Sequence, residues 1–141
     1  MEKQMVDVVG IAFFKNNSLL ISKSHNCAHN NKYTLVGGKI EKDESILDAA
    51  IRECKEEIGS NFNITKEDFI PILHFKERAA SDPNLFINIY ILLSTKEIDV
   101  PLITSEEILD YKWYTLKDGT DILGDSISKH LLKYAISRKL L

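Results

Sequence analysis

The chain has 141 residues, of which 44% are hydrophobic and 28% are charged, and its formal net charge is −3. This length and balance are typical of one globular domain, which we assign to residues 1–141, with a core large enough to need no disulfide or metal support. The slight negative charge argues against binding to duplex nucleic acid or to an anionic membrane, so any nucleotide partner is expected to be small.

Targeting signals are not evident in the sequence. The first residues lack a basic segment followed by an apolar core, so we predict no signal peptide. No apolar run approaches the roughly 20 residues of a membrane span. Two cysteines, Cys27 and Cys54, make no disulfide framework. We therefore expect a cytoplasmic protein.

The N-terminal region predicts a hairpin. Residues 6–14 are nearly all apolar and predict a first strand, Asn16 and Asn17 predict a turn, and residues 18–21 predict the second strand. The polar segment 25–31 predicts a loop.

His25, Cys27 and His29 in that loop raise the alternative of a soft-metal site. Zinc sites usually need four closely placed ligands with paired spacing, and no partner pair is present. We therefore favour an ordinary surface loop.

A short strand is expected at residues 33–36, leading into Gly37 and Gly38. Glycines at this point allow a sharp turn and let a backbone carbonyl approach a cation. A helix follows. Ser45, with Asp48 three residues later, approximates a capping box, and Gly59 is placed as the C-terminal cap.

This helix has an apolar face and an acidic edge. The apolar residues recur at the three-and-four spacing of a buried stripe: Leu47, Ala50, Ile51, Cys54 and Ile58. Glu53, Glu56 and Glu57 border the stripe within about a third of the helix circumference. Like charges one turn apart repel by roughly 0.2–0.5 kcal/mol per pair, and Arg52 relieves only part of this through Glu56. A hard cation such as Mg²⁺ would neutralise the cluster, whereas a solvated Glu-rich face is the alternative for this segment alone.

The spacing of the charged and glycine residues decides between these interpretations. Gly38, five residues, Glu44, seven residues and then the segment 52–59, Arg-Glu-Cys-Lys-Glu-Glu-Ile-Gly, resemble the Nudix box, G-x(5)-E-x(7)-R-E-U-x-E-E-x-G-U, in which U is bulky and apolar. Only Cys54 and Ser60 depart from it, at the U positions. The string Gly-Gly-Lys-Ile-Glu at 37–41 is similar to the MutT branch. The resemblance implies an α/β fold, an α/β/α sandwich with a mixed β-sheet between helices.

The resemblance also implies a reaction and a metal site. It implies hydrolysis of a phosphoanhydride bond in a nucleoside diphosphate linked to another moiety, with Mg²⁺, or Mn²⁺ in its place, as the cofactor. The implied ligands are Glu53, Glu56, Glu57 and the carbonyl of Gly37 or Gly38. Arg52 would orient Glu56 or a neighbouring acid through a bidentate contact, and Glu44 would brace the loop before the helix.

Three residues are candidates for contacts with the substrate. Lys23 follows the second strand, where Nudix enzymes often carry a basic residue that can approach the substrate phosphate. Lys39 could balance charge beside the acids. Either lysine could equally be an exposed, solvated side chain. In MutT-like relatives an acid near the start of the last helix can contact a purine base, which makes Asp125 a candidate.

Two more strands are predicted in the middle of the chain. Residues 69–75 predict a strand, which can lie at a sheet edge because Pro71 lacks an amide hydrogen. Residues 76–84 predict a charged loop. Residues 85–93 are almost wholly apolar, as in a strand covered on both faces. Asn88 interrupts this strand and either faces a ligand or is a satisfied polar group.

An acidic loop, residues 101–110, precedes a strand at 111–114 whose Trp113 we assign to the core. In several Nudix branches a Glu from this loop is the general base. Glu107 is our first choice and Glu106 the second, with Glu77 a distant third; each could instead be an exposed acid. The last helix is predicted to begin at Asp125 or Ser126.

The resemblance leaves several substrates open. Features of the ADP-ribose, dinucleoside polyphosphate and coenzyme A branches are missing or misplaced, so we expect a nucleoside triphosphate, including modified ones, cleaved to monophosphate and pyrophosphate. The alternatives are an ADP-ribose, nucleotide-sugar or dinucleotide pyrophosphatase, and a non-catalytic nucleotide-binding domain. The last is disfavoured because no box acid is lost. The family also suggests a homodimer.

Overall fold

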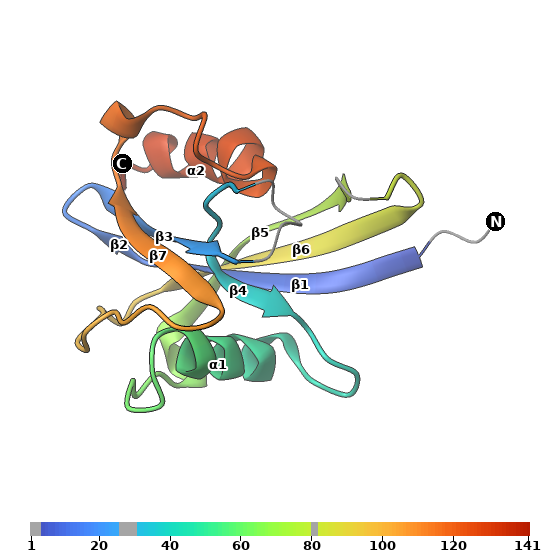
Figure 1. Ribbon diagram of the computed structural model, residues 1–141, viewed down its shortest axis with the longest axis horizontal. Helices are drawn as coiled ribbons and strands as arrows, with labels where there is room; N and C mark the ends of the chain where they lie inside the picture. The colour runs from blue at the N-terminus through green and yellow to red at the C-terminus, as the bar shows by residue number, and fades with distance from the viewer. Residues whose placement is uncertain (1–3, 26–30, 80–81) are drawn as a thin grey trace.

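A computed structural model describes residues 4–25, 31–79 and 82–141 (Figure 1). The strands are β1 Gln4–Ala12, β2 Phe14–Lys15, β3 Ser18–Ser24, β4 Val36–Lys39, β5 Phe69–Arg78, β6 Leu85–Ser94 and β7 Ile108–Tyr114. The helices are α1 Ile46–Glu57 and α2 Leu132–Ser137, the latter continuing a π-helical segment at Ser126–Leu131, with 3₁₀ turns at Lys66–Asp68 and Leu116–Asp118. No helix among the described residues is long and apolar enough to cross a membrane.

The strands form two sheets. One is mixed, with strand order β4-β1-β6-β5, in which β1 and β6 run parallel and the other neighbours antiparallel. The other is antiparallel, with order β2-β3-β7. Helix α1 covers one side of this arrangement and α2 the other (Figure 1), and a buried apolar cluster lies on each side. The predicted α/β/α sandwich with a mixed sheet is therefore confirmed.

The predicted hairpin is correct at its turn and wrong in its first strand. Asn16 and Asn17 both have positive φ, and Phe14 pairs with Leu19 across the turn. The longer β1, however, leaves the hairpin and joins β4 and β6 in the mixed sheet. The partner of a strand depends on contacts with residues far away in the chain, so the apolar pattern of residues 6–14 does not predict it.

Gly37 and Gly38 lie inside β4 rather than in a turn after a strand at 33–36. Gly37 pairs with Gly10 of β1 and has a φ of 151°. A Cβ atom at position 37 would stand 2.0 Å from the Val9 carbonyl oxygen. Glycine is therefore required here for the close approach of two strands.

Strand β5 extends to Arg78, so residues 76–78, which we predicted to be loop, are strand. Its pairing with β6 continues to Arg78 opposite Phe86, and this long-range pairing sustains the strand beyond the apolar run. β5 is an edge strand with a register shift between Pro71 and Leu73, as the proline predicted.

Strand β6 is less buried than its apolar composition predicts. Only Ile91 and Leu92 are buried, because the other end of the strand extends past both helices (Figure 1). Asn88 donates to Asp7 Oδ1 at 3.0 Å and to the Tyr90 hydroxyl at 2.9 Å, which supports its interpretation as a satisfied polar group. Trp113 packs against the core cluster beside α1, as predicted.

Candidate active site

The acidic residues of the site are carried by α1, whose boundaries follow from its caps. Ser45 Oγ accepts a hydrogen bond from the Asp48 amide at 3.1 Å, and Gly59, with a φ of 151°, ends the helix. The Asp48 carboxylate contacts Lys66 at 3.3 Å instead of closing the capping box. Ala50 and Cys54 of α1 pack in one cluster with Val9 and Val36 of the neighbouring strands, which fixes the orientation of the acidic edge.

Arg52 connects the loop before α1 to the acids on it. Its Nε and Nη2 atoms donate to the two oxygens of Glu44 at 2.8 and 2.9 Å, a bidentate pair. Its Nη1 atom donates to Glu53 Oε1 at 2.9 Å, whereas the contact to Glu56 is 3.4 Å long. The bidentate partner of Arg52 is thus Glu44 and not an acid of the helix.

Glu44 braces the loop, as expected. Besides the two bonds from Arg52, it accepts a hydrogen bond from the Glu41 amide at 3.0 Å. These hydrogen bonds lower the pKa of Glu44 to about 2, and those from Arg52 have the largest effect. Arg52 Nη2 also donates to the Lys39 carbonyl at 2.9 Å, so the guanidinium connects both ends of the loop.

Glu53 and Glu57 form a largely desolvated pair. Glu53 is 8% exposed, and Glu57 Oε2 accepts a hydrogen bond from the Gly37 amide at 2.7 Å. Burial raises the pKa of Glu57 to about 9, with the nearby charges of Glu53 and Glu107 acting in the same direction and the Gly37 amide opposing them. Burial also raises the pKa of Glu53, against the effect of Arg52. The site therefore holds two carboxyl groups whose ionised forms are costly without a further positive charge.

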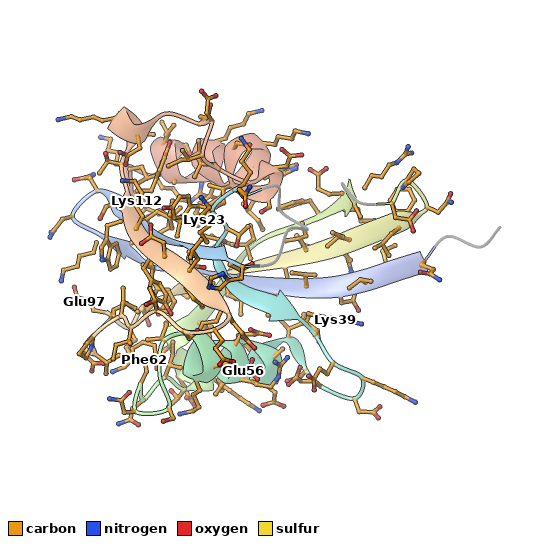
Figure 2. All side chains as sticks on the ribbon, viewed as in Figure 1. Lys23, Lys39, Glu56, Phe62, Glu97 and Lys112 are labelled. Atoms are coloured by element: carbon orange, nitrogen blue, oxygen red, sulfur yellow. The ribbon has the colours of Figure 1, made fainter. Side chains whose placement is uncertain are left out.

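Glu56 does not join this pair. Its side chain is 49% exposed and lies at α1 (Figure 2). Within residues 4–25, 31–79 and 82–141, no three His, Cys, Asp or Glu side chains converge as a metal-binding cluster. The buried Glu53 and the partly buried Glu57 nevertheless offer a hard oxygen donor set, which suits Mg²⁺ or Mn²⁺ when further protein, substrate and water oxygens complete the ligand shell.

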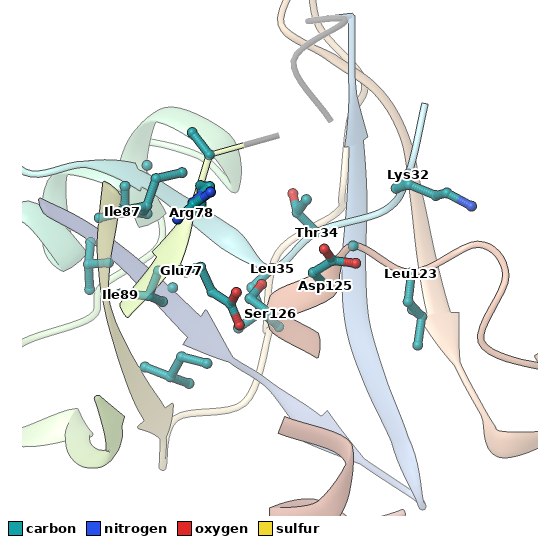
Figure 3. A pocket seen from close by; sticks show the side chains of 18 of the residues that line it. Lys32, Thr34, Leu35, Glu77, Arg78, Ile87, Ile89, Leu123, Asp125 and Ser126 are labelled. Carbon is teal, nitrogen blue, oxygen red and sulfur yellow. The ribbon is translucent and has the colours of Figure 1, made fainter. Parts of the chain in front are cut away.

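The glycines of β4 connect this acidic pair to a cavity. A Cβ atom on Gly38 would lie 2.5 Å from Glu53 Oε1, so Gly38 and the carboxylate are in direct contact. Gly37 and Gly38 also line a cavity of about 470 Å³, a volume suited to a small ligand. Asp125 and Ser126, at the start of the last helix, also line this cavity (Figure 3).

The other predicted substrate contacts lie elsewhere. Lys23 belongs to β3 and stands 5.6 Å from the ring centre of Tyr33, and Lys39 is exposed at the end of β4 (Figure 2). Neither lines the cavity, whereas Asp125 does. Asp125 occupies the N-cap position without a capping bond and pairs with Lys129 at 3.3 Å.

Several polar residues of the cavity were not singled out as substrate contacts by the sequence: Lys32, Thr34, Glu77, Arg78 and Ser126. For Glu77 a signal was available, since it alternates with Phe75 and Ala79 at the period of a strand. Extending β5 by this alternation would have placed Glu77 on the same face as Phe75. For the others the sequence carries no pattern that we recognise.

The candidate general bases lie before β7. Glu106 and Glu107 are both exposed, and the charge of Glu107 contributes to the raised pKa of Glu57. The Glu107 carbonyl accepts a hydrogen bond from the His25 amide at 3.0 Å. Cys27 and His29 of the soft-metal alternative lie outside the described residues, and His25 is exposed.

Known proteins resemble this chain in sequence and in fold. The model of the NUDIX domain family matches residues 4–134. The m7GpppN-mRNA hydrolase of Saccharomyces cerevisiae is 30% identical over 141 residues, which cover 98% of the chain but only 14% of the yeast protein.

Two solved structures share the fold. The MutT protein of Methanosarcina mazei Go1 has a TM-score of 0.74 at 19% identity, with 99% of each chain covered. A bifunctional NMN adenylyltransferase/ADP ribose pyrophosphatase from Francisella tularensis, complexed with AMP and a Mn ion, has a TM-score of 0.68 at 18% identity; the match covers 96% of this chain and 42% of that protein.

Proposed function

Because the chain belongs to the NUDIX domain family, we propose that it is a divalent-metal-dependent pyrophosphohydrolase that cleaves a phosphoanhydride bond in a small nucleotide. The observation that carries this proposal is the pair formed by the buried Glu53 and the partly buried Glu57, in contact with glycines that also line the cavity. The pair supplies negative charge for a cation, and the cavity supplies room for a nucleoside.

Glu53 and Glu57 would hold the metal, together with a carbonyl of the Gly37–Gly38 segment and with Glu56 at its exposed side. A bound Mg²⁺ or Mn²⁺ polarises phosphate oxygens and makes a water molecule more acidic. Arg52 keeps Glu53 in place through the bond to Oε1, and Glu44 in turn fixes Arg52. The Mn ion in the Francisella tularensis structure supports a divalent metal in this fold.

The chain positions the two parts of a nucleotide separately. The nucleoside would occupy the cavity, and the phosphates would lie beside Gly37 and Gly38, the residues that both line the cavity and contact the acids. Glu107, an exposed acid in the loop before β7 whose charge adds to the raised pKa of Glu57, would accept the proton of the attacking water. Positioning and charge stabilisation then account for most of the catalysis.

We further propose that the substrate is a nucleoside triphosphate, split into monophosphate and pyrophosphate. The test is a panel of nucleoside triphosphates, ADP-ribose and dinucleoside polyphosphates, incubated with Mg²⁺ and scored by product identity. Pyrophosphate release supports the triphosphate assignment, and preferential cleavage of ADP-ribose or a dinucleotide overturns it. Glu53→Gln should remove most activity, whereas Glu97→Gln, an exposed acid that does not line the cavity, should not.

A non-catalytic nucleotide-binding domain is the alternative. It would bind nucleotides and release no product under any metal condition. The presence of every acid of the box argues against it. The homodimer that the family suggests is tested by analytical ultracentrifugation, and the proposed cytoplasmic location is tested by cell fractionation.

A further inference from the structure

Glu77 is a partly buried carboxylate inside the cavity that the proposed mechanism does not use. It lies on β5 opposite Ile87 of β6, and its side chain is 24% exposed. Figure 3 shows its carboxylate directed into the cavity, which Ser126 also lines. The other carboxylate of the cavity wall, Asp125, is 69% exposed and pairs with Lys129. Glu77 is therefore the better placed of the two to meet a buried part of a ligand.

His130 holds the Glu77 carboxylate in place. Its Nε2 atom is hydrogen-bonded to Glu77 Oε1, and its ring stacks on Phe75 with centroids 3.8 Å apart. An ionised carboxylate has about four acceptor sites, so this bond leaves several free. A preorganised acceptor of this kind discriminates between ligands more sharply than a mobile surface acid.

The basic groups of the cavity have other partners, and one wall is apolar. Lys32 donates to the Asp121 carbonyl, and the Arg78 guanidinium lies 5.6 Å from the ring centre of Phe86. The wall formed by β6 presents Ile87, Ile89 and Ile91. A flat apolar group can pack on these isoleucines, and the polar group at its edge then meets the acceptor oxygens of Glu77.

We propose that Glu77 determines base specificity by accepting a hydrogen bond from the exocyclic amine of the substrate's nucleobase. The inference rests on the proposed function for its substrate class. A base with a carbonyl at the same position would set oxygen against oxygen, with neither group able to donate. Leaving such groups unpaired away from water is what allows a polar site to reject a near-isosteric ligand.

Matched nucleotide pairs test this directly. Dissociation constants of AMP and IMP, and of CMP and UMP, are measured by calorimetry without metal, so that no hydrolysis intervenes. In at least one pair, the wild-type protein should bind the amino nucleotide about tenfold more tightly or better, corresponding to one buried hydrogen bond. Glu77→Gln, whose amide can donate as well as accept, should bring the ratio to within about twofold, and Glu97→Gln should leave it unchanged.

A second variant separates orientation from folding. His130→Phe should reduce the discrimination because it frees the carboxylate, and His130→Gln, which retains a donor, should restore part of it. Thermal melts establish that each variant is folded. Equal binding of both members of each pair by the wild-type protein, or full discrimination by Glu77→Gln, overturns the inference.

The two proposals can fail separately. Discrimination in binding without hydrolysis of any nucleotide contradicts the proposed function and leaves the role of Glu77 intact. Hydrolysis without discrimination contradicts the role of Glu77 alone. Failure to bind any nucleotide contradicts both.

Discussion

Gly38 and Glu53 are so close that no side chain fits between them, since a Cβ atom at position 38 would stand 2.5 Å from Glu53 Oε1. The contact joins β4, an edge strand of the mixed sheet, to helix α1. It also places the carboxylate next to a residue that lines the cavity. The geometry of the site therefore depends on a missing side chain as much as on the acids.

Gly38→Ala should displace the Glu53 carboxylate. We expect a loss of about 1–3 kcal/mol in the free energy of unfolding from overpacking. Turnover should fall by roughly 100-fold, since small displacements of catalytic groups are costly. Gly119→Ala is the control: φ there is 76°, with no atom within 4 Å of the added Cβ. It should cost about 1–2 kcal/mol of stability from backbone strain and leave turnover unchanged. Wild-type turnover in Gly38→Ala would contradict the tight contact.

Glu57→Gln should stabilise the metal-free protein at alkaline pH. The pKa of Glu57 rises from 4.5 to about 9 in the folded state, so folding requires a proton that the unfolded chain does not bind. The contribution of this group to stability is full below pH 4.5 and is lost as the pH rises toward 9. Urea unfolding in EDTA should show the variant more stable than wild type by roughly 1–3 kcal/mol at pH 8, with a smaller difference at pH 5. An equal difference at both pH values would contradict the buried carboxyl.

Divalent metal should make the wild-type protein more stable than Glu57→Gln, the reverse of the order without metal. Mg²⁺ or Mn²⁺ at about 100 times its dissociation constant should add roughly 2.7 kcal/mol to the stability of the wild-type protein, as a ligand bound only to the folded state does. The thermal shift should be lost in Glu53→Gln and Glu57→Gln. It should be reduced less in Glu56→Gln, because that side chain is half exposed and its ionised form is already well solvated. A larger loss in Glu56→Gln than in the other two variants would reverse our assignment of the main ligands.

Glu44→Gln should make the protein less sensitive to acid. The pKa of Glu44 falls to about 2 in the folded state, so its stabilising effect is present above its ordinary pKa of 4.5 and is lost as the pH drops toward 2. Wild-type stability should therefore decline more steeply between pH 5 and pH 2 than that of the variant. Circular dichroism at a series of pH values measures both slopes. Parallel curves would show that the Arg52 contact does not persist in solution.

Glu107→Gln should lower turnover by roughly 100-fold or more if Glu107 is the general base. Glu106→Gln, the adjacent exposed acid, should stay close to wild type. The dependence of turnover on pH should lose its acidic limb in Glu107→Gln only. The opposite result for the two residues would assign the base to Glu106.

The local features of the chain were predictable from the sequence. The apolar spacing, Ser45 and Gly59 defined α1, the Asn16–Asn17 turn was correctly placed, and Pro71 indicated an edge strand. Each of these depends on residues within a few positions of one another, where propensity and capping dominate. The charged spacing of the box was likewise sufficient to identify the family.

The tertiary structure alone decided how these pieces meet. It assigned β1 to the mixed sheet, extended β5 so that Glu77 reaches the cavity, and gave the bidentate contact of Arg52 to Glu44 rather than to Glu56. It also buried Glu53 and left Glu56 half exposed, although both lie on the same edge of one helix. Helical periodicity places side chains around an axis, but burial depends on which distant strand packs beside them, and that is set by contacts between residues far apart in the chain.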